Sequence, residues 1–502
     1  MRMMFALASG LACSLATVAL ALPNEPDASG VRRGVVRWTD GREGSACVVT
    51  SDVPALPREL QHTIARIPAE VYRLDLDTGL EVAPFEDRGA SNNRINIVTV
   101  GDGYLSTQQA SYNSHVTNAT NQLFSYEPFK TYKNYFQVFR VNVVSSVQGV
   151  SNDPTQGIMR ATPLRMSYWC GGTERLLCVD VSACYSYAAN APQPFDQILA
   201  VANSQKYGGA GYPSSNVGTY AGGNGSAPLI AIHELGHSLG DLADEYDYGG
   251  STTYLGGEPS DANSSKLTAA QMASQQRKWF RWLSESRSGF DSPVGTYEGS
   301  SYSQLGIYRP SPNSMMRALG PNFNLPSAEQ LIKSIYNVVK PIDGPPSPTT
   351  ETVLGPASSV SLTLMPTVNN PLSVQWLLDG EPIPGATDAS FNVESLNLRK
   401  GSSTLAVRVI DTTTMVRDEA FRGSRMMQTL TWSMPVAACL PDLDGDRSVD
   451  DTDFVGFAEM YNVLLCSAVA PAECAADFNE DGLVDDADFV VFAAAYNALM
   501  CP

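Results

Sequence analysis

Two apolar runs separated by a helical pattern mark the core of the first half of the chain. Residues 94–100 form a nearly continuous apolar run, which predicts a buried strand, and a helical pattern follows over about 106–125. A second strand is predicted at 136–144. A buried strand followed by a helix indicates an α/β layer. The stretches at 205–226 and 249–265 are rich in Gly, Ser and Tyr, and we expect long loops there.

The segments on either side of this α/β region have a different pattern. Residues 22–90 hold short apolar runs such as 32–38, broken by turn residues, and are predicted to be β-rich. A Pro-rich linker at 344–350 precedes a segment, 351–436, in which short runs alternate apolar and polar residues. Turn residues separate these runs. We therefore expect a small β-sandwich of the immunoglobulin-like kind, with Trp376 in its core.

The last 64 residues contain an internal repeat with a period of 35 residues. The repeated residues are Cys439, Asp442, Asp444, Asp446, Asp450, Asp453 and Cys466, which recur as Cys474, Asp477, Asn479, Asp481, Asp485, Asp488 and Cys501. The Asp and Asn residues of each repeat occupy positions 1, 3, 5, 9 and 12 of a loop. At this spacing their side-chain oxygens can surround one Ca²⁺, together with the backbone carbonyl of position 7. An apolar helix is predicted after each loop, at 454–465 and 489–500. We expect two structural Ca²⁺ ions; the alternative is an acidic surface cluster.

These paired loops resemble the calcium loops of type I dockerins, in which Asp holds position 12. The resemblance implies a small α-helical, EF-hand-like module and a cohesin-like or other surface partner. One departure is Arg447 at position 6, where the second loop has Gly482. Gly eases a left-handed turn, so the first site is expected to bind Ca²⁺ more weakly. Disulfides between the two cysteines that bracket each repeat would stabilise so small a core.

Composition limits the classes of function. The chain has 502 residues, of which 43% are hydrophobic, enough for several packed domains. Its net charge of −19 argues against a nucleic-acid partner, because phosphate binding needs clustered Lys and Arg. Beyond the N-terminal 22 residues, no stretch is apolar and long enough to span a bilayer.

The N-terminus has the pattern of a secretory signal peptide. Arg2 precedes an almost wholly apolar run at 5–22, and Ala19-Leu20-Ala21 fits an A-x-A cleavage site. We expect cleavage after Ala21, a secreted protein, and no membrane association of the mature chain. The alternative is an uncleaved membrane anchor.

The cysteine count fits an exported protein. Of nine cysteines, Cys13 lies in the signal peptide, and the eight that remain form an even number, which indicates disulfides. Four of them bracket the C-terminal repeats. The pairing of the other four does not follow from the sequence; they are Cys47, Cys170, Cys178 and Cys184.

The strongest chemical motif is His233-Glu234-Leu235-Gly236-His237. Two histidines four residues apart lie on one face of a helix and can share one Zn²⁺. Glu234 beside them can act as general base toward a zinc-bound water. Ser226 is expected to cap the helix, and Pro228 suits its first turn. The alternative is a chance occurrence on a core helix, and a chain with four histidines makes that coincidence rare.

A catalytic zinc also needs a third protein ligand and an open position. Gly240 lets the helix end and the chain turn back. The metzincin signature places its third ligand at the position of Ala243, and Asp244 follows one residue later. We favour Asp244, with Glu245 as the alternative third ligand; a hydrogen-bonded structural cluster is another role for this pair. The remaining candidates for the third ligand are His62, His115 and Glu258.

Two further features complete the candidate site. A second metzincin trait is a Met-containing turn beneath the zinc, and the segment 308–317 fits it, with Met316 as our choice and Met315 as the alternative. The tetrahedral oxyanion of peptide hydrolysis needs a donor besides zinc. Tyr246 and Tyr308 are candidates, and packing in the core is the alternative role for each.

The segment that carries these motifs resembles the peptidase M64 family, the bacterial metallopeptidases typified by IgA proteinase. The matching stretches are 93–104, 127–132, 173–180, 233–246, 297–299 and 308–310. The resemblance covers about residues 30–340 and implies an α/β zincin-like catalytic domain and an endopeptidase of the metzincin-like branch. It does not imply cleavage of immunoglobulin, because specificity lies in loops that a family does not fix.

The sequence thus predicts a multidomain, secreted, zinc-dependent endopeptidase with one catalytic Zn²⁺, which hydrolyses peptide bonds of extracellular proteins. The expected parts are a signal peptide at 1–21, a β-rich domain at 22–90, the catalytic domain at 91–343, the immunoglobulin-like sandwich at 344–437 and the dockerin-like module at 438–502. One alternative is a non-catalytic zinc-containing binding protein recruited through its C-terminal modules, although such a protein has no need of Glu234. The other is a zinc hydrolase that acts on substrates other than peptides.

Overall fold

The computed structural model divides the chain into two compact units. Unit 1 comprises Met1–Lys340, Pro366–Pro371 and Thr412–Met426; unit 2 comprises Pro341–Met365, Leu372–Asp411 and Met427–Pro502. The structure describes residues 81–247, 252–355, 358–369, 372–396, 401–436, 440–444, 448–461, 475–479 and 481–498, and the backbone of 31–37 and 43–49. The predicted signal peptide lies outside these residues. Within them, no helix is both long and apolar enough to cross a membrane.

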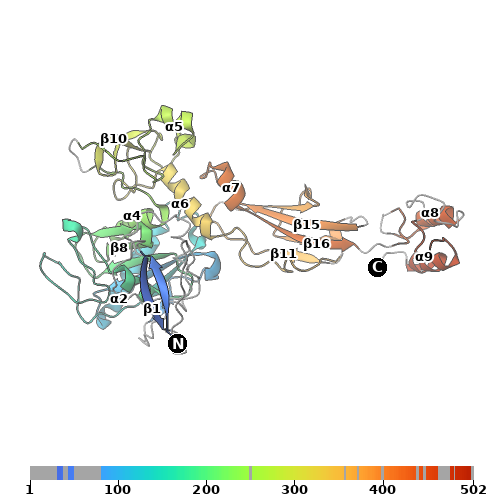
Figure 1. The fold of residues 1–502 in the computed structure, drawn as a ribbon, viewed down its shortest axis with the longest axis horizontal. Coiled ribbons are helices and arrows are strands. Elements are labelled where there is room, and N and C mark those ends of the chain that lie inside the picture. Colours follow the sequence, from blue (N-terminus) through green and yellow to red (C-terminus); the bar gives the residue numbers. More distant parts are fainter. Residues whose placement is uncertain are drawn as a thin grey trace. The chain divides into compact units, whose positions relative to one another are not determined.

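Unit 1 is built on a six-stranded sheet in the order β3-β5-β4-β6-β8-β7. Figure 1 labels β8 of this sheet and the helices α2 and α4. These strands are β3 (Val82–Pro84), β4 (Ile95–Asp102), β5 (Phe136–Val141), β6 (Gln197–Ala202), β7 (Gly209–Tyr212) and β8 (Val217–Ala221). The four inner strands are parallel, and the two edge strands, β3 and β7, are antiparallel to their neighbours. The strands predicted at 94–100 and 136–144 are confirmed as β4 and β5, although β5 ends three residues early.

Helices cover both faces of this sheet. Side chains alternate along a strand, so Ile97 and Thr99 of β4 face α2 (Gln109–Leu123) and α4 (Ala227–Gly240). Val98 and Val100 belong to the opposite core, which includes residues of α3 (Val181–Ala188). The structure confirms both the helix predicted over about 106–125 and the α/β layer.

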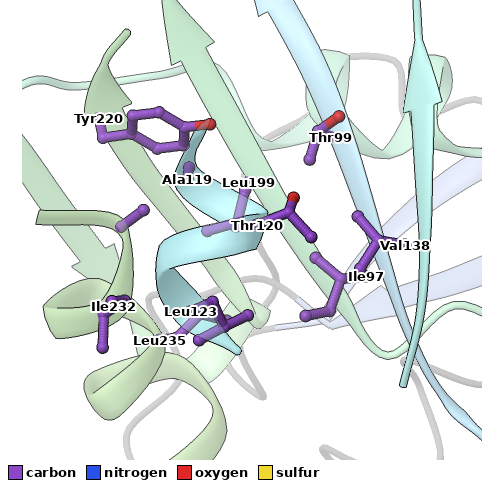
Figure 2. Close-up of a pocket in the computed structure, with 11 residues that line it drawn as sticks. Ile97, Thr99, Ala119, Thr120, Leu123, Val138, Leu199, Tyr220, Ile232 and Leu235 are labelled. Carbon is purple, nitrogen blue, oxygen red and sulfur yellow. The ribbon is translucent and has the colours of Figure 1, made fainter. Parts of the chain in front are cut away.

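An apolar pocket lies between the sheet and helices α2 and α4 (Figure 2). Its lining residues, all buried, are Ile97, Thr99, Ala119, Thr120, Leu123, Val138, Leu199, Tyr220, Ala231, Ile232 and Leu235. The predicted zinc ligands are not among them, although α4 contributes to both places. The pocket therefore belongs to the core of unit 1 and not to the candidate active site.

The loop predicted at 205–226 is wrong in part, because this stretch contains β7 and β8. Its glycines hide the strand pattern, and they are required by close packing against α4. A Cβ at Gly209 would lie 2.5 Å from Ile230 Cγ2, and one at Gly211 would lie 2.9 Å from His237 Cβ. A loop was also predicted at 249–265. The described part of this stretch, 252–265, contains no helix and no strand of the sheets, so the prediction is confirmed there.

The remaining elements of unit 1 are shorter. They are the antiparallel pair β1 (Val31–Arg37) and β2 (Glu43–Val49), α5 (Ala269–Gln275), the hairpin of β9 (Tyr297–Ser300) and β10 (Ser303–Arg309), α6 (Leu325–Val338) and α7 (Glu419–Arg425). Helix α6 packs against α4. Its buried residues include Leu331 and Ile335, which lie one turn apart on the face that contributes to the core.

Within its described residues, unit 2 has two small antiparallel sheets, one of two strands and one of four in the order β13-β12-β15-β16. The strands are β11 (Ser359–Ser361) paired with β14 (Ser390–Asn392), and β12 (Ser373–Leu378), β13 (Glu381–Pro382), β15 (Gly401–Ile410) and β16 (Met427–Val436). Trp376 and Trp432 are fully buried in the core of these strands, with ring centroids 5.9 Å apart. Trp376 is therefore a core residue, as predicted.

Two helices of the C-terminal repeats, α8 (Asp451–Tyr461) and α9 (Asp486–Ala498), pack through a small aromatic core that includes Phe457 and Phe492. Both helices begin three residues before their predicted starts. The Tyr461 hydroxyl donates to Asp486 Oδ1, and the Tyr496 hydroxyl donates to Asp451 Oδ1. Each partner in this second bond is displaced by 35 from its counterpart in the first, so the repeat in sequence is also a repeat of contacts.

Candidate metal centre and active site

Helix α4 carries the two histidines of the motif, and Pro228 lies in its first turn. The predicted cap by the Ser226 side chain is wrong, because that hydroxyl makes no capping bond. Asn224 closes the turn instead: its Oδ1 accepts from the Ser226 N–H at 2.9 Å, and its carbonyl accepts from the Ala227 N–H at 3.0 Å. The helix ends at Gly240, as expected, and Asp241 takes the left-handed conformation, with φ 49°, that turns the chain back.

The two imidazoles lie on one face of α4 with their Nε2 atoms 3.2 Å apart. On the other side of each ring, Nδ1 is held by a backbone carbonyl: His233 Nδ1 lies 2.9 Å from Met315 O, and His237 Nδ1 lies 2.6 Å from Leu242 O. A carbonyl can only accept, so Nδ1 carries the proton in each neutral ring. Both Nε2 lone pairs therefore point at the same place, as metal-ligating histidines require.

Asp244 brings a carboxylate to this place from the segment that follows the helix. Its Oδ1 lies 3.1 Å from His233 Nε2 and 3.3 Å from His237 Nε2. Asp244 is 7% exposed. Burial alone would raise its pKa, but the hydrogen bonds and charges of the two histidines hold that pKa well below its usual range.

The three donor atoms fit a tetrahedral metal ion. Ligand bonds of 2.0–2.2 Å in a tetrahedron place neighbouring ligand atoms about 3.3 Å apart. The three observed separations are 3.2, 3.1 and 3.3 Å. Three acceptors this close repel one another unless a proton or a metal ion lies between them. Burial would lower the pKa of His237, but Asp244 and Glu234 raise it to about 9, which indicates that the carboxylates favour positive charge at this place.

Glu234 lies beside this group, pointed toward the edge strand β7. A Cβ at Gly209 would meet its Oε1 at 2.9 Å, and one at Gly211 would meet its Oε2 at 3.0 Å. The residue is 7% exposed, and burial raises the pKa of its carboxyl. Within the described part of the chain, no hydrogen-bond donor is bound to this carboxylate. A buried carboxylate that lacks donors and has a raised pKa is poised to accept a proton.

The turn containing Met315 and Met316 lies against the same helix. Both side chains are fully buried, and a Cβ at Gly236 would lie 2.4 Å from Met316 Sδ. Met316 thus packs against α4 at Gly236, which lies between His233 and His237 in the sequence. Met315 takes part through its carbonyl, which holds His233. The predicted turn therefore contributes both residues, by different atoms.

Glu245 is placed away from the three donor atoms, although it follows Asp244 directly. Its Oε1 accepts from Asn263 Nδ2 at 2.9 Å and Asn324 Nδ2 at 2.8 Å, and its Oε2 accepts from the Ser314 hydroxyl at 2.7 Å. The side chain is fully buried, and burial raises its pKa against these three donors. Glu245 therefore ties the segment after α4 to the methionine turn and to the start of α6, which is the structural role considered for this pair.

The other candidates for a third ligand are not near the histidines in the described structure. His115 lies 2.9 Å from the Tyr104 hydroxyl through its Nδ1. Glu258 binds the Ser265 hydroxyl at 2.6 Å and the Lys266 N–H at 2.8 Å in its own loop. His62 lies outside the described residues. The group of potential metal ligands here consists of His233, His237 and Asp244.

Of the two tyrosines considered as oxyanion donors, Tyr246 is placed at the site. Its ring lies nearly parallel to that of His233, at 18° with 6.5 Å between centroids. The backbone of Tyr308 pairs with Ser265 through two hydrogen bonds, and no contact links its side chain to the histidines.

Two residues at the site were not predicted from the sequence. The Tyr302 hydroxyl donates to Asp244 Oδ2. Arg175 Nη2 donates to the Tyr246 hydroxyl at 3.1 Å, and its guanidinium lies 5.7 Å from the Tyr246 ring centroid. Arg175 belongs to the matching stretch 173–180, a signal that could have found it. Tyr302 comes 58 residues after Asp244 in no recognisable motif.

The loop that carries Arg175 is closed by a disulfide between Cys170 and Cys178. Backbone bonds join this loop to the edge strand, from the Gly209 N–H to Arg175 O at 3.3 Å and from the Leu177 N–H to Gly209 O at 3.4 Å. Cys184 is a buried free thiol, so the expectation that it forms a disulfide is wrong. Burial raises the pKa of this thiol well above its usual range, which keeps it unreactive. The side chains of the remaining cysteines lie outside the described residues.

The C-terminal loops gather their carboxylates around their own backbones. Asp453 accepts from the N–H groups of Leu443, Asp444 and Asp450, and Asp488 accepts from those of Phe478, Asn479 and Asp485. Oxygens of Asp442, Asp444 and Asp453 lie within 4.8 Å of one another. Gly482 has φ 89°, so position 6 of the second loop does need a left-handed residue. Asp446 and Arg447 lie outside the described residues.

Comparison with known proteins agrees with this geometry. A search of curated proteins found no match to the chain. Residues 83–293 match the family model described as IgA Peptidase M64. This region includes the sheet, helix α4 and all three donors, which places the chain among peptidases and implies a metal at the site. Over this region the chain is similar to the peptidase M64 family.

Proposed function

We propose that the chain is a secreted, zinc-dependent endopeptidase that hydrolyses peptide bonds of extracellular proteins. The observation that carries the proposal is the convergence of His233 Nε2, His237 Nε2 and Asp244 Oδ1 at tetrahedral spacing. Glu234, whose carboxylate has no bound donor among the described residues, lies directly beside them. Two imidazoles and one carboxylate are a ligand set that suits Zn²⁺ and leaves one position open.

Each residue has a defined task in this mechanism. The carbonyls of Met315 and Leu242 keep both imidazoles in the tautomer that presents Nε2. Zn²⁺, when bound, supplies a Lewis acid that polarises a carbonyl group and lowers the pKa of water. Glu234 accepts the proton of the attacking water and delivers it to the leaving amine. Its burial supports this role, because the raised pKa brings the carboxyl closer to the working pH.

The edge strand β7 supports a peptide as the substrate. It is the last strand of the sheet and lies beside the Glu234 carboxylate through Gly209 and Gly211. The loop that carries Arg175 already binds the backbone of Gly209, and an extended peptide can add by backbone hydrogen bonds to the part of this edge beyond Gly209. Of the candidate oxyanion donors, Tyr246 is favoured over Tyr308, because its ring lies against His233.

Metal analysis combined with digestion of a broad peptide library tests the proposal. We expect one Zn²⁺ per chain, cleavage within peptides whose termini are blocked, and loss of cleavage on chelation. Stoichiometric zinc without cleavage of any peptide would favour a binding protein. Cleavage confined to esters or other small substrates would favour the alternative hydrolase.

The parts that follow the catalytic region are proposed to be an immunoglobulin-like sandwich at 344–437 and a dockerin-like module at 438–502. The two antiparallel sheets around Trp376 and Trp432 support the first. The matched hydrogen bonds of Asp453 and Asp488 support two calcium loops with the same plan. The dockerin resemblance implies a cohesin-like or other surface partner for this module, and the alternative is a stabilised tail with no partner. Calorimetric titration of the chain with Ca²⁺ tests the two proposed calcium sites, and a flat titration would contradict them.

A further inference from the structure

The turn of the β9–β10 hairpin holds the segment that carries Asp244. Ser300 pairs with Ser303, which leaves Ser301 and Tyr302 as a two-residue loop. The Ser301 N–H donates to Asp244 O at 2.9 Å, and the Tyr302 N–H donates to Tyr246 O at 3.1 Å. The hairpin therefore fixes the backbone on both sides of the glutamate between these two residues.

The loop has a backbone conformation that its residues disfavour. Both Ser301 and Tyr302 have positive φ, 47° and 64°. Two-residue turns of this kind favour Asn and Gly, because a side chain with a Cβ is strained there, and a bulky residue such as Tyr is an outlier. Strained residues of this kind concentrate at functional sites, where the surrounding contacts hold them in place. A tyrosine at this position thus needs a reason in its side chain.

That side chain reaches the proposed metal ligand. The Tyr302 hydroxyl donates to Asp244 Oδ2, while Asp244 Oδ1 faces the two Nε2 atoms. We propose that Tyr302 is a positioning residue that fixes the Asp244 carboxylate with Oδ1 toward the metal. The inference rests on the proposed zinc site and adds a residue to it.

The division of labour between the two oxygens explains why this bond matters. A carboxylate held at one point only can rotate, and either oxygen or both can then face the histidines. With Oδ2 occupied by the tyrosine, the ligand presents a single oxygen in a fixed direction, and less freedom is lost when the metal binds. Outer hydrogen bonds of this type change metal affinity by about 10–100-fold.

Zinc affinity of the full-length Tyr302→Phe variant, measured by competition with a chelating dye, tests the proposal. The variant keeps the ring and its contact with Tyr246, whose centroid lies 5.4 Å away, and removes only the hydroxyl. We expect zinc to bind about 10–100-fold more weakly, with KM unchanged once the enzyme is saturated with zinc. Tyr297→Phe is the matched control from the same hairpin, because the Tyr297 hydroxyl donates to Pro293 O and not to the site. The control should bind zinc within about twofold of wild type.

A second variant separates this role from one in folding. Tyr302→Gly removes the hydroxyl and also relaxes the left-handed backbone, so the zinc-free protein should retain its melting temperature while zinc affinity falls as in Tyr302→Phe. Normal zinc affinity in both variants would overturn the proposal. A lower kcat with normal zinc affinity would also overturn it, because the half-exposed tyrosine would then act on the substrate. Failure of the wild-type protein to bind zinc would instead contradict the proposed function itself.

Discussion

The metal centre of unit 1 and the acidic loops of unit 2 gather metal-type ligands by opposite routes. In the loops, the last carboxylate of each repeat is held by the backbone of its own repeat: Asp453 and Asp488 each accept from N–H groups within 10 residues. In the metal centre, His233 is oriented by a carbonyl 82 residues away, and Asp244 by a hydroxyl 58 residues away. One arrangement is local and the other depends on the tertiary fold.

This difference determines how each site should respond to mutation. If the loops bind Ca²⁺ as proposed, a local loop should lose its own ion when one ligand is removed, with little effect on the rest of the chain. A site assembled from a helix, a turn and a hairpin depends on residues that never touch the metal. The following predictions test this contrast, beginning with the largest expected effect.

The Glu234→Gln variant should lose most of its activity and keep its metal. The ligands His233, His237 and Asp244 remain, but the amide cannot accept a proton, so kcat should fall by about 10³–10⁴-fold. Zinc content after dialysis and single-turnover cleavage of a peptide measure the two effects separately. Turnover within tenfold of wild type would remove Glu234 from the mechanism.

The contrast also explains how far the sequence could predict the molecule. The histidine pair, Glu234 and the paired loops follow from short-range spacing, and the structure places the two histidines on one face of α4 with Glu234 beside them. Asp244 was favoured over Glu245, but the sequence could not exclude Glu245. It is the tertiary contacts of Glu245 with Asn263, Asn324 and Ser314 that hold it away from the histidines. Tyr302 could not be found, because nothing in the sequence relates a hairpin turn to a residue 58 positions earlier.

Strands β7 and β8 were missed for a related reason. Their glycines are typical of loops, yet contact with α4 leaves no room for larger side chains. Hydrophobic periodicity reveals strands whose side chains face a core. It does not reveal β7 and β8, because α4 packs so closely against them that glycine is required. The Ser226 cap was wrong: its hydroxyl makes no capping bond, and Asn224, two residues earlier, accepts from the Ser226 N–H instead.

Substitutions of the adjacent residues Asp244 and Glu245 should distinguish a metal ligand from a residue with a structural role. Asp244→Ala removes one of three donors, and we expect zinc affinity to fall by more than about 100-fold. Glu245→Gln keeps the shape of a side chain that binds three donors, so zinc affinity should stay within about tenfold while the protein becomes less stable. Chelator competition and urea unfolding of both variants measure this. Loss of zinc from the Glu245 variant alone would reverse the assignment.

The packing of Met316 against Gly236 of α4 should contribute to the stability of the protein, although the two residues are far apart in sequence. In Gly236→Ala, the new methyl group would lie 2.4 Å from Met316 Sδ and 3.0 Å from Phe323 Cε1, so these buried side chains must move. Overpacking of this kind costs about 1–3 kcal/mol in the free energy of unfolding. Adding Met316→Ala creates room, and the double variant should be more stable than the sum of the single changes predicts. Strict additivity would show that the two residues are not in contact.

The smallest effect is expected when the local loops are altered. Asp488 of the second loop accepts three backbone N–H groups, as Asp453 does in the first, so Asp488→Ala should abolish one Ca²⁺-binding event and lower the melting temperature of its own module. Asp453→Ala should remove the weaker event, because Gly482 satisfies the left-handed turn of the second loop while Arg447 occupies that position in the first.

Neither change touches the contacts of His233, His237 or Asp244, so zinc content and kcat/KM should stay within about twofold of wild type. Calorimetric titration with Ca²⁺ and peptide cleavage on the same preparations compare the two sites. A parallel loss of calcium binding and peptidase activity would show that the repeats support the catalytic unit, and the contrast between a local and a tertiary site would fail.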